Sequence, residues 1–98
     1  MLEELKNYLN ITWEDVATDN KLQGFIDDGK AYLKEVAGTD LDFDNDRFVK
    51  SLLKDYCRYA YNHSLELFEV NFKRSLLKLS IREGVKAHAA TKTTSRNF

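Results

Sequence analysis

Four aspartates alternate along the segment GTDLDFDNDRF, and carboxylates at alternate positions are the early ligands of an EF-hand calcium loop. Counted from Asp40, the sixth position is Asn45 where such a loop needs glycine, and the twelfth is Ser51 where it needs glutamate. Leu41 and Phe43 alternate with the acids, as in a short connection whose apolar side chains dock on a core. The segment therefore predicts a loop with an aspartate cap before the next helix, and no calcium site.

A nucleophile–base pair is the second kind of chemistry to consider. Cys57 lies six residues before His63 in a helical pattern, and six helical residues correspond to about 240° of net rotation, so the two side chains point apart. The chain has one cysteine and can form no internal disulfide, which fits a reducing compartment. We therefore expect Cys57 to be a buried structural residue. Asp27 and Asp28 are adjacent and do not meet the geometry of a general acid–base pair.

The remaining signatures of catalysis are missing from the sequence. His63 lies in the helical pattern and His88 in the C-terminal tail, so we expect no shared metal site. The chain has no phosphate-binding glycine loop, no HExxH and no GxSxG. We predict that the protein is not an enzyme and uses no cofactor or metal.

The composition predicts the elements that hold these residues. The chain has 98 residues, no proline and four glycines, and this scarcity of turn formers favours long helices with few connections. We predict a small all-α domain over residues 1–81, with about four helices including one long central helix, and a flexible tail over residues 82–98. No run of eighteen apolar residues occurs, and the start is acidic where a signal peptide is basic, so we expect a soluble protein that is not secreted and has no membrane partner.

Charge is unevenly distributed along the chain. Residues 1–81 hold 11 basic and 15 acidic residues, a net charge of −4, whereas residues 82–98 hold four basic residues and one acid, a net charge of +3. The basic tail could contact phosphates without base specificity. However, no predicted helix carries the dense basic face of a nucleic-acid reader.

Two helices are expected before residue 40. The leucines of MLEELKNYLNI recur at helical spacing, and this short helix would be stable only when docked. A continuous apolar stripe predicts a second helix over residues 19–36, which Gly38 ends. The start of the second helix stays open among three candidate caps: Thr12 (with Asp15 at the third position of a capping box), Thr18 and Asp19.

The third predicted helix starts near Asn45 or Asp46 and runs into the sixties or beyond. Its apolar residues from Tyr56 to Phe72 span about 240° of the helix surface, whereas a surface helix usually buries about 100° or somewhat more. Two explanations remain open. The chain bends near residues 62–64 and doubles its contacts internally, or a neighbouring subunit covers part of the arc.

The end of the chain has little pattern. The run KRSLLKLSI predicts one more short helix that ends near Ile81. The remainder is polar, basic and without periodicity, so we expect it to be disordered or ordered only against a partner.

The order of these segments resembles the small head–tail connector (adaptor) proteins of long-tailed bacteriophages and prophages. The resemblance covers residues 2–81 and is carried by YL followed by ITWED, an acid-rich helix with GKAYL, a GTDLDF connection, and LLKDYCRYAYNHSLELFEVNF. None of these stretches is a catalytic signature. The resemblance lies in their joint order and spacing.

The resemblance implies a helical subunit of a ring, typically twelve-fold, at the head–tail junction of the virion, made in the bacterial cytoplasm during assembly. Its implied partners are other copies of itself, the portal protein above the ring and a tail-completion or stopper protein below it. DNA would pass through the lumen without specific binding. The runner-up function is a small helical adaptor or regulator of a mobile element that contacts nucleic acid through its basic tail.

Helical geometry, rather than any family motif, leads to hypotheses for the contact residues. The subunit interface is assigned to the aromatic arc, with an arginine that pairs with an acid across the junction: Arg58, Tyr59, Tyr61 and Phe68. The portal-docking hypothesis assigns four residues of the tail: Lys86, Lys92, Arg96 and Phe98.

Overall fold

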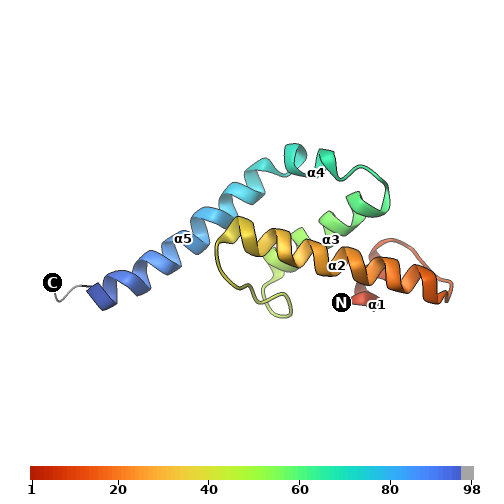
Figure 1. Ribbon diagram of the computed structural model, residues 1–98, viewed down its shortest axis with the longest axis horizontal. Coiled ribbons are helices and arrows are strands. Elements are labelled where there is room, and N and C mark those ends of the chain that lie inside the picture. Colours follow the sequence, from red (N-terminus) through yellow and green to blue (C-terminus); the bar gives the residue numbers. More distant parts are fainter. Residues whose placement is uncertain (96–98) are drawn as a thin grey trace.

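The computed structural model describes the backbone of residues 1–95 and the side chains of residues 1–87. The protein is all-α, as predicted, and the described residues form five helices and no strand. Figure 1 shows their arrangement. In chain order the helices are α1 (Leu2–Tyr8), α2 (Val16–Ala37), α3 (Arg47–Tyr61), α4 (Glu66–Asn71) and α5 (Lys73–Ser95).

Helix α1 is short and docked, as the sequence predicts. Leu5 is fully buried in the common core, and Lys6 is 3% exposed. The Lys6 Nζ lies 3.0 Å from the Asp19 carboxylate on α2, and the Lys50 Nζ of α3 lies 2.7 Å from the Glu4 carboxylate. Apolar burial and ion pairs to both neighbouring helices therefore hold a helix that is too short to be stable alone.

Helix α2 buries the predicted stripe but starts at a cap that the sequence did not identify. Asp15 is the N-cap, and its carboxylate accepts hydrogen bonds from the Thr18 amide at 3.2 Å and the Thr18 hydroxyl at 2.7 Å. The candidates Thr12, Thr18 and Asp19 were wrong as caps, because Thr18 serves as the donor at the third helical position. Gly38 ends the helix with φ 75°, as predicted.

Helices α2 and α3 form the centre of the core. Gly29 lets them approach closely, since a Cβ at this position would lie 2.7 Å from Leu53 Cδ1 and 2.8 Å from Tyr56 Cδ1. Asp46 is the N-cap of α3, and its carboxylate accepts hydrogen bonds from the amides of Phe48 and Val49. The predicted aspartate cap after the acidic loop is therefore confirmed.

The chain reverses direction after Tyr61. This favours the first explanation of the wide aromatic arc, a bend that lets the chain make the contacts internally. His63 adopts φ 55°, the His63 amide donates to the Ala60 carbonyl at 3.1 Å, and the Ser64 amide donates to the Tyr59 carbonyl at 2.9 Å. This pair of bonds is a Schellman motif with histidine in the left-handed position. The helix runs into the sixties and ends at Tyr61, and the bend expected near residues 62–64 divides the arc between α3 and α4.

Helix α5 continues to Ser95, so the predicted helix end near Ile81 was wrong. Its first half packs against α2 and α4, and its second half extends past the other helices to the far end of the molecule (Figure 1). The molecule measures 59 × 25 × 17 Å. Its radius of gyration is 15.9 Å, whereas a compact domain of this length has one of about 12.6 Å.

Within the part of the chain that the structure describes, no helix has the length and apolar character needed to cross a membrane.

Candidate assembly surface

An internal aromatic cluster contains two of the four predicted interface residues, Tyr59 and Phe68. Phe68 on α4 is 1% exposed. Its ring centroid lies 4.8 Å from that of Phe72, 5.5 Å from Tyr56 and 5.7 Å from Tyr59. Phe68 therefore has no surface to offer a neighbouring subunit in this fold, and Tyr59 is half-buried against it. Sequence periodicity placed these rings on one helix, but the reversal packs Phe68 edge-on against Tyr56 and Tyr59.

Arg58 and Tyr61 also make contacts within their own chain. The Arg58 guanidinium lies 5.1 Å from the Tyr59 ring centroid and 3.6 Å from the Asp55 carboxylate one turn away. The Tyr8 hydroxyl of α1 donates a hydrogen bond to the same carboxylate. Tyr61 is half-buried and packs against the core. The acid that pairs with Arg58 therefore lies in the same subunit, where the sequence hypothesis placed it across a junction.

Cys57 is fully buried, as predicted. Burial raises the pKa of the Cys57 thiol from 9.0 to about 12. The thiolate is the reactive form of cysteine, so the thiol stays protonated and inert at neutral pH. His63 lies in the exposed reversal after α3, outside the buried core. Within residues 1–87, no cluster of three His, Cys, Asp or Glu side chains is placed to hold a metal ion.

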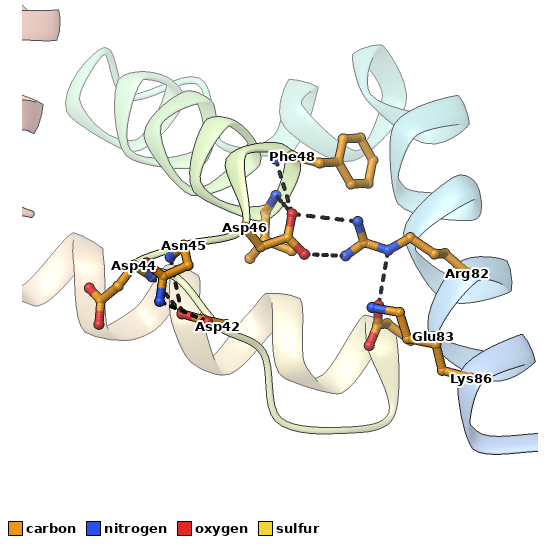
Figure 2. Close-up of polar contacts among 9 residues, drawn as sticks. Asp42, Asp44, Asn45, Asp46, Phe48, Arg82, Glu83 and Lys86 are labelled. Atoms are coloured by element: carbon orange, nitrogen blue, oxygen red, sulfur yellow. Dashed lines mark hydrogen bonds and ion pairs between the residues drawn. The ribbon is translucent and has the colours of Figure 1, made fainter. Parts of the chain in front are cut away.

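The acidic loop uses its carboxylates to order its own backbone (Figure 2). The Asp42 carboxylate accepts hydrogen bonds from the amides of Asp44 and Asn45 and from the Asn45 side chain, each at 3.1 Å. These bonds lower the pKa of Asp42 from 3.8, with the Asn45 side chain as the largest cause. Phe43 in the same loop is buried. The alternation of acids and apolar residues therefore reflects a docked connection.

Arg82 links α5 to this loop, and Figure 2 shows the network. Its guanidinium donates to the Asp46 carboxylate at 2.6 Å and 3.5 Å and to Glu83 at 2.9 Å, and it lies 5.2 Å from the Phe48 ring centroid. Lys86 lies 3.0 Å from the same Glu83 carboxylate. Burial raises the pKa of Asp46, but the hydrogen bonds from Arg82 and from two backbone amides outweigh burial and leave this pKa lowered from 3.8.

These contacts place the first part of the predicted tail in the folded body. Arg82 is half-buried and Glu83 is 6% exposed, so the helical packing extends past residue 81. Lys86 is exposed on α5 beside Glu83. Lys92 lies in the helical backbone of α5, but its side chain lies outside the described residues, as do Arg96 and Phe98.

The outward face of α5 carries an apolar stripe that the sequence predictions missed. Leu77, Ile81 and Val85 recur every fourth residue and are 57%, 57% and 61% exposed; these three residues are called the α5 stripe below. Val70 on α4, 70% exposed, continues the apolar surface at the start of α5, where it lines a shallow groove with Leu77. The spacing of four residues is visible in the sequence. It was missed because it runs past residue 81, where the helical domain was predicted to end.

Contiguous exposed apolar residues on one face make the α5 stripe a candidate assembly surface. Comparison of the chain with models of protein families, with curated proteins and with solved structures finds no match.

Proposed function

We propose that this protein is a non-enzymatic structural subunit of a phage head–tail junction, which assembles as a ring beneath the portal and extends the DNA channel toward the tail. The segment order of residues 2–81 supports the choice of this family. The observation that carries the proposal is the α5 stripe, an apolar face on a helix that extends beyond the rest of the molecule (Figure 1).

A ring assembles through one contact that is repeated between identical subunits, and its assembly needs no catalysed reaction. A head-to-tail contact between identical subunits gives a closed ring when its rotation closes. Such a subunit needs an exposed surface for its neighbour and a rigid body to fix the angle between them. The α5 stripe supplies the first, and the anchoring of α5 by Arg82 supports the second.

The charge of the chain is compatible with a channel for DNA. Residues 1–81 carry a net charge of −4, and acidic groups that face a lumen weaken adhesion of the phosphate backbone. Residues 82–98 carry a net charge of +3, and the proposal assigns this basic tail to docking on the portal.

The test is the native mass of this protein mixed in excess with the portal ring from its own source. We expect a discrete gain of about one copy per portal subunit, as matched rings require. A chain truncated after Ala87 should lose this gain, since it lacks most of the tail. It keeps Arg82, Glu83 and Lys86, so its fold is preserved and a loss can be assigned to docking.

The absence of any gain at saturating concentration would overturn the connector function. Salt-dependent binding of the free protein to DNA, measured in parallel, would then favour the regulator of a mobile element. The truncated chain is the matched control in this arm as well, because the regulator function assigns DNA contact to the same tail.

A further inference from the structure

The outward face of α2 complements the α5 stripe in shape. Ala17, Gly24 and Ala31 are exposed and recur every seventh residue, which places them within about 20° of one another per step on the helix surface. These three residues are called the α2 small face. Small residues along one face let a second helix approach closely, and Leu77, Ile81 and Val85 supply the bulk to fill such a face.

The two faces also complement each other in charge. Asp28 and Glu35 flank the α2 small face, and Lys73 and Arg74 flank the α5 stripe; all four are exposed. Within residues 1–87, none of the four makes an ion pair. Each face therefore carries charges that its own chain leaves free for a partner of opposite sign.

Gly24 lies on the α2 small face and Gly84 lies beside the α5 stripe. Neither glycine is needed for packing within its own chain. A Cβ added at Gly24 or at Gly84 would meet no atom within 4 Å. A glycine inside a helix costs about 1 kcal/mol of stability relative to alanine. By contrast, Gly29 is required by the close contact of α2 with α3. We therefore infer that Gly24 and Gly84 serve the close approach of another backbone.

We propose that the α5 stripe of one copy packs on the α2 small face of a second copy, with the two helices antiparallel. The charges fix this direction, because the cations lie at the start of α5 and the acids lie in the second half of α2. A single register then places three pairs opposite one another: Gly24 with Gly84, Ala31 with Leu77, and Glu35 with Lys73.

The surface of the chain is large enough for such a contact. A compact monomer of 11.4 kDa exposes about 5,800 Å². This chain exposes 6704 Å². The surplus of roughly 900 Å² reflects the extended shape of the molecule, and one standard interface takes 800 Å² or so from each partner.

The contact joins two different faces, so each copy can bind two neighbours. Repetition gives an open chain of subunits or a closed ring, and the smallest ring is a pair joined by two copies of the contact. The inference rests on the proposed function for its biological setting, the ring at the head–tail junction. Its structural content concerns only the contact between two copies.

Cysteine cross-linking of the full chain tests the register. In the variant with Ala31→Cys and Leu77→Cys, mild oxidation should give a ladder of covalent dimers, trimers and larger species, since a disulfide needs Cα atoms within about 7 Å. Each single variant should give dimers at most. The matched control combines Ala17→Cys with Leu77→Cys, which places the first cysteine 14 residues, or about 21 Å, out of register. An equal ladder from the control would overturn the proposed pairing.

Mixing of two blocked chains tests the two-faced contact without cross-links. Ile81→Lys blocks the stripe and Gly24→Lys blocks the small face, and both positions are exposed with room for the new side chain. Native mass should show a monomer for each variant and a 1:1 dimer, nothing larger, for the mixture. Wild-type protein that stays monomeric at about 1 mM, or variants that assemble as the wild type does, would overturn the inference.

Neither experiment contains the portal, so the inference and the proposed function can fail separately. Pairing of the two faces without portal binding would retain the contact and remove the connector function. Portal binding by chains that show no such pairing would retain the connector and remove this interface.

Discussion

Replacement of Phe68 by alanine distinguishes a core residue from a subunit contact at the centre of the aromatic arc. Phe68 is 1% exposed and lies within 5.7 Å, between ring centroids, of Tyr56, Tyr59 and Phe72. Its ring joins α4 to α3 and, through Tyr32, to α2. The structure therefore predicts a loss of folding stability, whereas an interface role predicts a loss of assembly with the monomer intact.

The size of the effect follows from the burial of the ring. Removal of a fully buried phenylalanine side chain costs about 3–5 kcal/mol, and the lost aromatic pairs add to the transfer of the ring. A domain of this size has a total stability of about 5–15 kcal/mol. Since 1 kcal/mol shifts the Tm of a small domain by about 4–8 °C, the Tm of Phe68→Ala should fall by roughly 12–40 °C.

Thermal and urea unfolding, followed by circular dichroism, measure this effect. Leu67→Ala is the matched control, because Leu67 is the preceding residue of the same helix and is 48% exposed. We expect the control to change the free energy of unfolding by about 0.5 kcal/mol or less. A Phe68→Ala monomer as stable as the wild type, with reduced assembly, would refute the placement of Phe68 in the core.

Two further predictions concern α2 and the anchor of α5. Gly29→Ala should destabilise the protein by about 1–2 kcal/mol, since the new methyl group overpacks the contact with α3, whereas Gly24→Ala should stabilise it by up to about 1 kcal/mol; urea midpoints of the two variants check the contrast. The folded-state pKa of Asp46 lies below its ordinary value of 3.8, so its contribution to stability is full above that value and is lost as the pH falls through the folded pKa. Asp46→Asn should therefore lower the free energy of unfolding at pH 7 by about 1 kcal/mol, through the lost pair with Arg82, and flatten its decline below about pH 4; an unchanged acid profile would contradict this role.

Features that depend on local pattern could be predicted from the sequence. The lack of proline and the scarcity of glycine indicated an all-α domain, and the apolar stripe of residues 19–36 located α2 to within a turn at each end. Gly38 and Asp46 were identifiable as helix ends because their roles depend on their own backbone and side chain. Burial of Cys57 followed from its place in an apolar pattern.

The way in which the aromatic arc is covered depends on contacts between helices, which local spacing does not reveal. Periodicity measures angles around one continuous helix, and it loses meaning where the chain reverses. The reversal depends on His63 in a left-handed conformation that glycine usually occupies, so the sequence offered a bend near residues 62–64 only as one of two alternatives. Once α4 folds back, Phe68 meets Tyr56 and Tyr59 inside the subunit, and the hypothesis of an aromatic interface loses its surface.

The length of α5 was likewise decided by tertiary contacts. Residues after Ile81 have weak helical periodicity, but Arg82 reaches Asp46, which lies 36 positions earlier in the chain and caps α3 at the same time. A contact between residues so distant in sequence cannot be read from local spacing. It fixes the helix against the body and turns Leu77, Ile81 and Val85 outward, which places the candidate assembly surface on α5 rather than on the aromatic arc.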